Sequence, residues 1–384
     1  MEHSGLPWRR DVHEEILTRL IGPRPGPGRR PAKLEELAAE LHRLLGVPAF
    51  NPDSPQELLR ALHRTGIEVR STRSWELRGQ RHPAIGPLLE YKKLARLASA
   101  NGWSWLDSWA GAGRFRTEYV VGGVVTGRWA SRGGGALQIP QQVRDAARAD
   151  DGCRLVVADA SQLEPRVLAA LAQDEALAAA AQGKDLYQGI ADAGFGGDRG
   201  KAKVAMLGAM YGATTGESGR LMPQLAKTYP RAIGTVERAA RAGEAGQVVS
   251  SYLGRSCPPP SENWRRVQLS ASADEQRRAD AAARSRGRFT RNFIVQSTAA
   301  EWALCWLAEV RRRLRASAAA GTVVGELVFF MHDEVVLHVR QDQADVACAL
   351  IEQAAAEAIR LMFGRIPVDF PLSIAVVGSY AEAK

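Results

Sequence analysis

Two mainly apolar runs of strand-forming residues, 326–331 and 335–339, are separated only by His332-Asp333-Glu334. So short a connection predicts a β-hairpin with this tripeptide at its turn. A third apolar run, 155–158, leads into Asp159. Acidic side chains within apolar segments are costly to bury unless they are paired or bind a metal. If the strand that ends at Asp159 lies beside the hairpin, the carboxylates of Asp159 and Asp333 converge on one point.

Convergent carboxylates at strand ends suit one chemistry in particular. They can hold two Mg²⁺ ions roughly 3.5–4 Å apart, which clamps the attacking and leaving oxygens of a phosphoryl displacement. Simpler explanations exist for each acid alone, because Asp333 and Glu334 can form a polar turn and Asp159 can cap a helix. The two features together favour the metal-binding interpretation.

A predicted helix between these segments carries two cations on one face. Arg199, Lys203, Leu207 and Tyr211 follow one another at steps of four, so they span a sector of about 120°. Such a face can hold a triphosphate at its cationic end and a base or sugar at its aromatic end. A solvated surface helix with a core tyrosine is the alternative. The position between the two carboxylate segments favours the functional interpretation.

The remaining patterns predict how the chain is organised. A basic helical unit is expected over 32–105, after a short helix at 8–21 and a linker at 22–28. The order is then strands, a mainly helical stretch from 166, and strands again, which predicts a sheet domain split by an insertion. Further elements are expected as an exposed, aperiodic connection over 254–290, helices over 292–314 and 343–363, and a strand over 372–376.

Charge and composition restrict the partner and the compartment. Lys and Arg number 51 against 42 Asp and Glu, a net charge of +9, and only eight of the 51 are Lys. Arginine suits bidentate phosphate contacts, although a GC-rich genome also enriches it. No apolar stretch reaches the ~18 residues of a membrane span and no secretion signal is present, so we expect a cytosolic protein without membrane contacts. The four cysteines lie far apart and are expected to be free thiols.

Five motifs resemble those of the bacterial DNA polymerase I family, family A. Asp159-Ala160-Ser161-Gln162-Leu163-Glu164-Pro165-Arg166 is similar to the family's Asp-Tyr-Ser-Gln-Ile-Glu-Leu-Arg signature. The helix from Arg199 to Gly212 resembles the fingers helix, and His332-Asp333-Glu334 resembles the second palm motif. Thr126-Gly127-Arg128 with Leu137-Gln138-Ile139-Pro140 is similar to a fourth element, and Arg288 to Ala300 to a fifth. They occur in the family's order and cover about residues 32–384.

This resemblance implies an α+β fold with right-hand polymerase architecture: an antiparallel-sheet palm, helical fingers and a helical thumb. The implied divisions are a short N-terminal remnant and linker (1–31), thumb (32–111), first palm part (112–165), fingers (166–295) and second palm part (296–384). The thumb is expected to grip duplex DNA mainly through its phosphates, which makes binding strongly salt-dependent.

The resemblance also implies roles for individual residues. Asp159 and Asp333 would bind two Mg²⁺, with Mn²⁺ as a substitute, while Glu334 supports the catalytic tip and Lys203 acts as general acid. Glu164 would be the steric gate against ribonucleotides. The other expected nucleotide-binding residues are Arg199, Lys203, Leu207, Tyr211, Gln162, Tyr187 and His332. The expected DNA-binding residues are Arg128, Arg288, Asn292 and Gln296.

The implied activity is template-directed DNA synthesis from deoxynucleotides on a primer–template. A monomer in the bacterial cytoplasm, associated with the nucleoid, is expected. About 30 residues precede the thumb and contain no Asp-x-Glu pair. We therefore expect neither a 3′–5′ exonuclease nor a 5′-nuclease in this chain.

Several departures from the family pattern leave the metal ligands and phosphate cations intact, so we expect activity with altered fidelity, sugar choice or speed. They are Ala160 and Tyr187 in place of Tyr and His, Pro165 and Leu207 in place of an aliphatic and an aromatic residue, and Ser297 in place of Gly. Two alternatives stay open. A single-subunit RNA polymerase shares most motifs, but Glu164 counts against it. A non-catalytic DNA-binding protein of the same fold has no need of converging carboxylates.

Overall fold

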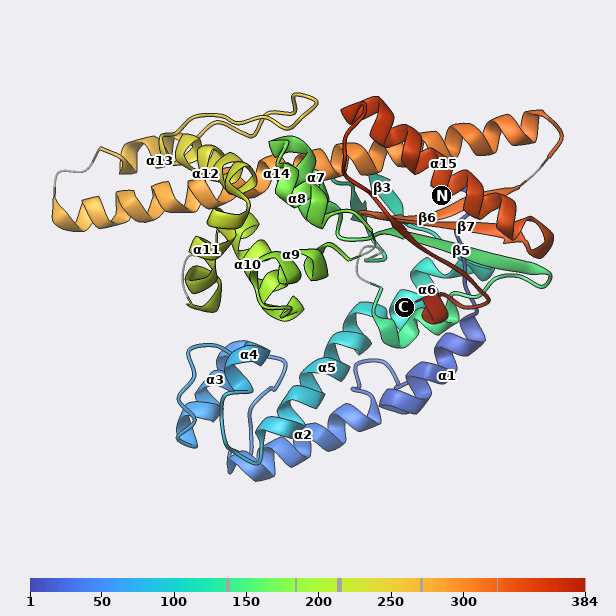
Figure 1. Cartoon of the computed structure of the whole chain (residues 1–384). Coiled ribbons are helices and arrows are strands. Elements are labelled where there is room, and N and C mark those ends of the chain that lie inside the picture. Colours follow the sequence, from blue (N-terminus) through green and yellow to red (C-terminus); the bar gives the residue numbers. More distant parts are fainter. Residues whose placement is uncertain (136–138, 184, 213–215, 270–271, 323, 384) are drawn as a thin grey trace. The chain divides into compact units, whose positions relative to one another are not determined.

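The computed structural model describes residues 1–383 except 136–138, 184, 213–215, 270–271 and 323 (Figure 1). Leu137 and Gln138 of the fourth motif therefore lie outside the described residues. The chain forms two compact units. The sheet unit comprises Met1, Tyr119–Ser131 and Gly152–Val377. The helical unit comprises Glu2–Glu118, Arg132–Asp151 and the residues from Gly378 onward.

The sheet unit is built on four antiparallel strands in the order β6-β7-β5-β8. They are β5 (Cys153–Ala160), β6 (Gly325–Met331), β7 (Glu334–Arg340) and β8 (Leu372–Val377). The predicted hairpin is confirmed, because β6 and β7 pair with Met331 opposite Glu334. The run at 155–158 is buried because β5 lies between β7 and β8 and contacts α15 (Ala344–Phe363). Antiparallel strands combined with many helices confirm the α+β class.

The insertion between β5 and β6 is helical, as predicted for its first part. Five of its helices begin at an Asp or Ser side chain that accepts a hydrogen bond from the first turn, which stabilises a helix start. The helices are α7 (Leu163–Ala172), α8 (Glu175–Ala180), α9 (Leu186–Gly194), α10 (Arg199–Tyr211), α11 (Gly216–Thr228), α12 (Pro230–Glu244), α13 (Glu262–Val267) and α14 (Ala273–Ala319).

The expectation of an exposed, aperiodic connection over 254–290 is wrong for its second half. Helix α13 occupies part of this stretch, and α14 begins at Ala273 rather than near 292. The first turns of α14 are mostly exposed, so they need no apolar periodicity, and their Ala and Arg residues favour helix intrinsically. Where α14 crosses α12, a Cβ on Gly243 would lie 2.0 Å from Thr290 Oγ1, so this crossing requires glycine.

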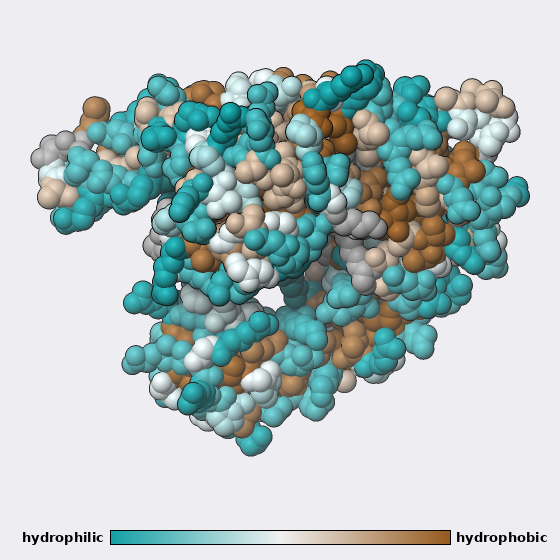
Figure 2. All heavy atoms as spheres, in the orientation of Figure 1, coloured by the Kyte–Doolittle hydropathy of each residue, from teal (hydrophilic) through white to brown (hydrophobic). Residues whose placement is uncertain are grey.

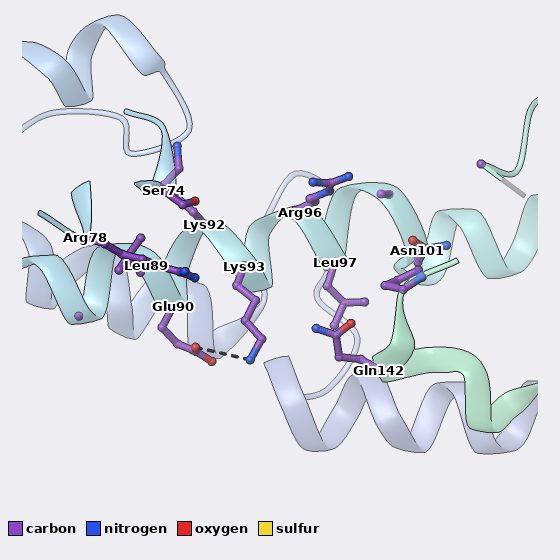
Figure 3. Close-up of a pocket in the computed structure, with 14 residues that line it drawn as sticks. Ser74, Arg78, Leu89, Glu90, Lys92, Lys93, Arg96, Leu97, Asn101 and Gln142 are labelled. Carbon is purple, nitrogen blue, oxygen red and sulfur yellow. Dashed lines mark ion pairs between the residues drawn. The ribbon is translucent and has the colours of Figure 1, made fainter. Parts of the chain in front are cut away.

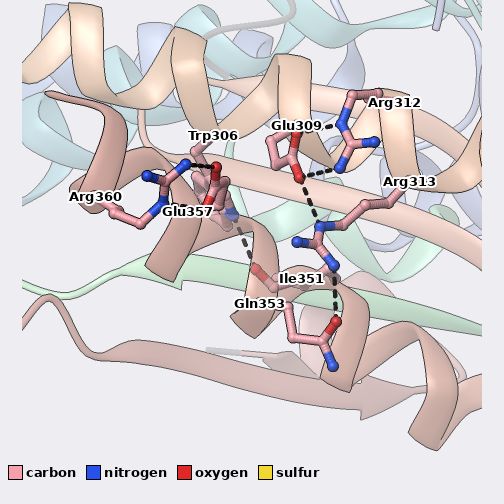
Figure 4. Close-up of polar contacts among 8 residues, drawn as sticks. All are labelled: Trp306, Glu309, Arg312, Arg313, Ile351, Gln353, Glu357 and Arg360. Atoms are coloured by element: carbon pink, nitrogen blue, oxygen red, sulfur yellow. Dashed lines mark hydrogen bonds and ion pairs between the residues drawn. The ribbon is translucent and has the colours of Figure 1, made fainter.

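Helices α14 and α15 contact each other at Trp306 and along a polar edge (Figure 4). The Trp306 indole nitrogen donates to the Ile351 carbonyl at 3.2 Å. Nearby, Glu309 accepts hydrogen bonds from Arg312 and Arg313, and Arg313 also donates to Gln353 on α15 at 2.8 Å. The C-terminal half of α14 is thereby fixed against α15.

The helical unit contains the two-stranded sheet β1 (Leu6–Pro7) and β2 (Arg114–Phe115). Trp8, Trp105 and Phe115 form an aromatic cluster beside this sheet, with ring centroids 5.0–5.7 Å apart. The N-terminal segment is therefore packed into the unit. The unit's helices are α1 (Arg10–Ile21), α2 (Ala32–Leu45), α3 (Pro55–Arg64), α4 (Ser74–Leu77), α5 (Ile85–Asn101) and α6 (Trp103–Trp109).

Short elements complete the fold. Strands β3 (Glu118–Val120) and β4 (Ala130–Arg132) pair with each other. The 3₁₀ turns are η1 (Gly111–Gly113), η3 (Gln141–Ala146), η4 (Gln341–Gln343) and η5 (Tyr380–Ala383). Hydrophilic residues cover most of the face shown in Figure 2. None of the helices in the described part of the chain is long and apolar enough to cross a membrane.

Candidate active site

The ends of β5 and β7 bring the two predicted metal-binding carboxylates together. Asp159 lies opposite Glu334 in the strand register, and the Ala160 amide donates to the Asp333 carbonyl at 3.0 Å. His332 adopts a left-handed conformation, φ 57°, which lets the chain turn tightly between β6 and β7. Asp333 therefore stands at the tip of the hairpin, beside the end of β5.

The electrostatics of this tip reflect burial together with neighbouring negative charge. Burial, and then the charge of Asp159, raise the pKa of Asp333 to about 6. Burial also lowers the pKa of His332, and the charge of Arg128 acts in the same direction. A cation bound here would relieve the repulsion between the two carboxylates. Oxygen donors of this kind are those that Mg²⁺ prefers.

Glu164, in the first turn of α7, is held from two sides. Arg128 donates to one carboxylate oxygen at 2.5 Å, and the Tyr211 hydroxyl donates to the other at 2.6 Å. The Glu164 side chain is only 14% exposed, so its position is well defined. Burial and the Glu164 carboxylate raise the pKa of Tyr211, whereas Gln296 hydrogen-bonds its hydroxyl and opposes that shift. Residues predicted from three separate motifs thus meet at one carboxylate.

Helix α10 presents its predicted face as expected from the spacing. Arg199, Lys203 and Tyr211 are exposed, and Leu207 is half-buried, whereas Ala202, Ala205, Met206 and Ala209 on the opposite side are buried. Arg199 Nε donates to Asp185 at 2.7 Å, and its guanidinium lies 5.7 Å from the centroid of the Tyr187 ring. Gln162 also donates to Asp185, at 2.9 Å. A contiguous set of polar groups therefore joins α7, α9 and α10.

The predicted DNA-binding residues of α14 lie along one side of that helix. Arg288 is exposed, and Asn292 and Gln296 are half-buried one and two turns further on. The Arg288 side chain lies against Gly212 at the end of α10, where a Cβ would approach it to 2.6 Å. Asn292 Oδ1 is buried and has no hydrogen-bond partner among the described residues. This row of side chains continues the polar surface beyond Tyr211.

Four residues of the site region were given no role from the sequence. Asp185 links Gln162 to Arg199. Arg255 lies against Gly127, where a Cβ would meet its Nε at 2.6 Å. Buried Arg291 of α14 donates to the Ala209 carbonyl near the end of α10, and fully buried Arg166 donates to four backbone carbonyls. Only Asp185 has a local signal, as an Asp directly before a helix.

A separate group of charged side chains lines a depression of about 740 Å³ in the helical unit (Figure 3). Lys92, Lys93 and Arg96 project from α5, and Arg78 follows α4. Glu90 is the acidic residue among those that line the depression, and its Oε2 lies 3.8 Å from Lys93 Nζ. The depression is therefore cationic overall.

Comparisons with known proteins agree with this geometry. Residues 29–379 match DNA polymerase family A. The thermostable DNA polymerase I of Thermus filiformis is 29% identical over 92% of this chain and 44% of its own length, and the DNA polymerase I of Chloroflexus aurantiacus is 27% identical over 85% and 37%. This chain thus spans less than half of these curated relatives.

A solved structure shows the same fold. The POL domain of Pol1 from M. smegmatis, in complex with DNA primer-template and dNTP, superimposes with a TM-score of 0.81 at 21% identity, covering 100% of this chain and 68% of that one. The predicted right-hand architecture is confirmed by this likeness. With the family match over nearly the whole chain, it follows that the protein belongs to DNA polymerase family A.

Proposed function

We propose that the chain is a template-directed DNA polymerase that adds deoxynucleotides to a primer 3′-hydroxyl. The observation that carries this proposal is the pairing of β5 with β7, which sets Asp159 beside Asp333 in the unit that also contains the cationic face of α10. The membership in family A supports it. Primer–template DNA and deoxynucleotides are the proposed partners, and both are bound by the M. smegmatis neighbour. We further propose that it acts as a monomer at the bacterial nucleoid.

Two Mg²⁺ ions, or Mn²⁺ in their place, are proposed to bind at Asp159 and Asp333. The fit rests on two adjacent oxygen donors whose mutual repulsion a cation relieves. Bound metal would supply an activated hydroxyl and a stabilised leaving group. Glu334, fully buried at the start of β7, would keep the hairpin tip rigid.

The other site residues are proposed to act on the nucleotide. Arg199 and Lys203 hold the triphosphate, and Lys203 donates a proton to the departing pyrophosphate. Glu164 occupies the space that a ribose 2′-hydroxyl requires, while Leu207 faces the sugar and Tyr211 the templating base. The neighbouring side chains proposed to shape this pocket are Gln162, Tyr187 and His332.

DNA contacts are proposed for both units. In the sheet unit, Arg128, Arg288, Asn292 and Gln296 would contact primer and template. Residues 32–111 would act as the thumb and use the cationic depression of Figure 3 for duplex phosphates. Residues 112–165 and 296–384 would be the palm, and 166–295 the fingers.

Nuclease activity is not expected from these residues. By resemblance to the family, a proofreading site needs a cluster of metal-binding carboxylates that includes an Asp-x-Glu pair, and no such pair occurs before Asp145 in this sequence. A primer with a mismatched 3′ end should therefore stay intact with the purified chain and Mg²⁺. Shortening of that primer would refute the expectation.

Primer extension tests the main proposal. Asp159→Asn and Asp333→Asn should each reduce extension by more than about a thousand-fold while leaving primer–template affinity nearly unchanged, because electrostatic stabilisation of the reacting oxygens is lost. Asp342→Asn is the matched control, since Asp342 follows the opposite end of β7 and forms its ion pair with Arg340. Extension by the double variant Asp159→Asn/Asp333→Asn at the native rate would overturn the proposal.

A further inference from the structure

Asp185, directly before α9, uses its two carboxylate oxygens for different purposes. Oδ1 accepts hydrogen bonds from the Tyr187 and Gln188 amides at 3.1 and 3.2 Å, which cap the helix, and from Gln162 Nε2 at 2.9 Å. Oδ2 accepts from Arg199 Nε at 2.7 Å. One oxygen therefore anchors Asp185 to α9 and α7, and the other holds the guanidinium at the start of α10.

The way in which Arg199 is held leaves its phosphate-binding side available. Within the described part of the chain, its hydrogen bond uses Nε, so both terminal nitrogens stay available for an anion. The guanidinium also lies over the Tyr187 ring, a favourable cation–π arrangement. Tyr187 is only 7% exposed, so it supports Arg199 from the protein side.

The support behind Asp185 extends into the buried core. The Gln162 side-chain oxygen accepts from the Leu186 amide at 2.8 Å, and Arg166 lies behind it at 3.5 Å. Arg166 is fully buried and fixed by backbone carbonyls from three segments. Burial alone would raise the pKa of Asp185, but the hydrogen bonds from Arg199 and Gln162 outweigh it and lower the pKa. The carboxylate is therefore charged at neutral pH and rigidly placed.

We propose that Asp185 is a positioning residue for the incoming triphosphate, acting with Tyr187 through Arg199. Asp185 fixes Nε from behind and Tyr187 supports the guanidinium plane, so the terminal nitrogens meet the phosphates already oriented. Less side-chain freedom is then lost when the nucleotide binds. This role depends on the proposed function, because it requires Arg199 to bind the triphosphate.

Asp185→Asn removes the contact selectively. Its Oδ1 can still cap α9 and accept from Gln162, but its Nδ2 cannot accept from Arg199. The KM for deoxynucleotides should rise about five-fold, in the range of one partly exposed ion pair, while kcat and primer–template affinity change less than about two-fold. Asp198→Asn is the matched control, because Asp198 caps α10 and pairs with Lys201 rather than Arg199. It should leave the KM unchanged.

A double-mutant cycle separates positioning from helix capping. Arg199→Ala should raise the KM by itself, and adding Asp185→Asn should then have no further effect. A further several-fold rise in the double variant would show that Asp185 acts through α9, and a lower KM in Asp185→Asn would show that it competes with phosphate. Either result would overturn the positioning role of Asp185 while leaving the proposed role of Arg199 in triphosphate binding intact. An unchanged KM in Arg199→Ala would instead refute the proposed role of Arg199 in binding.

A second variant keeps the test independent of the stability of Asp185→Asn. Arg199→Lys leaves Asp185 and the α9 cap intact but has no guanidinium to be held at one nitrogen and to bind through two others. Its KM should rise at least as much as that of Asp185→Asn. A native KM in Arg199→Lys would overturn the positioning role, because orientation of the planar group would then be irrelevant.

Discussion

The two units of the protein handle charge in opposite ways. In the sheet unit, carboxylates are brought close together at strand ends, and burial with mutual repulsion shifts the pKa of Asp333. In the helical unit, Lys92, Lys93, Arg96 and Arg78 surround an open depression. The first arrangement depends on register and on individual atoms, whereas the second depends mainly on the sum of charges. Substitutions should therefore have large, atom-specific effects in the sheet unit and small, additive effects in the helical unit.

Apart from the loss of extension expected at Asp159 and Asp333, the largest expected effect on activity concerns Glu164. Glu164→Ala should weaken discrimination against ribonucleotides on the order of a hundred-fold, because the space for a 2′-hydroxyl opens. Glu164→Gln keeps the bulk while removing the charge held by Arg128 and Tyr211, so it should retain most of the discrimination. The measurement is kcat/KM for matched deoxy- and ribonucleotides. Equal sugar preference in Glu164→Ala and the native chain would contradict the gate role.

The next effect separates activity from stability at Asp333. Its folded-state pKa of about 6 lies above the ordinary 3.8, so ionising it costs stability, and this cost grows from about pH 4 to pH 6 and stays above pH 6. Asp333→Asn should therefore stabilise the metal-free protein at pH 7.5 by as much as about 3 kcal/mol and hardly at all at pH 4. Denaturant unfolding at both pH values measures this. A gain that does not change with pH would contradict the raised pKa of Asp333.

A smaller and additive effect is expected in the helical unit. Lys92→Ala and Arg96→Ala should each weaken primer–template binding several-fold, and each should reduce the slope of log affinity against log salt by about 0.9 for every phosphate that is no longer neutralised. The double variant should show the sum of the two effects. Fluorescence anisotropy across a salt series measures both quantities. If the loss of primer–template affinity differed strongly between Lys92→Ala and Arg96→Ala, the helical unit would not act through the sum of its charges, and the contrast with the sheet unit would be wrong.

The smallest effect is expected at the α14–α15 edge. Hydrogen bonds from Arg312 and Arg313 lower the pKa of Glu309 against the effect of burial. The contribution of ionised Glu309 to the free energy of unfolding is therefore present above about pH 4.5, and it is lost as the pH falls through the folded-state pKa of Glu309. Glu309→Gln should destabilise the fold by about 0.5–1 kcal/mol at pH 7. The more exposed pair of Glu357 and Arg360 is the control, and Glu357→Gln should shift the melting temperature less.

Local patterns predicted those features that depend on local physics. The β6–β7 hairpin, β5 and the cationic face of α10 all follow from short periodic runs in the sequence. The start of α14 at Ala273 could not be predicted in this way, because an exposed helix needs no apolar stripe. Its Ala and Arg residues indicate a helix only through their intrinsic propensity.

Contacts between residues that are far apart in the sequence could not be predicted, for a different reason. The hydrogen bond from Arg199 to Asp185 spans 14 positions, and Arg255 meets Gly127 across more than a hundred. No periodicity encodes which of many arginines reaches a given carboxylate or glycine. Arg166 illustrates this further, since a charged residue in a motif gives no sign that it will be fully buried among carbonyl groups.

Helix α14 is so long that a small tilt would move its N-terminal end much further than its central residues. Its 47 residues extend about 70 Å, and it is fixed in its C-terminal half, where Trp302 stacks on Phe370 and Trp306 donates to the Ile351 carbonyl. For a tilt of about 5° around Trp302, the Ala273 end would swing by ~4 Å, whereas Gln296, only six residues from the pivot, would move less than ~1 Å. A displacement of the mostly exposed first turns of this helix is thus attenuated before it reaches Gln296, which hydrogen-bonds Tyr211.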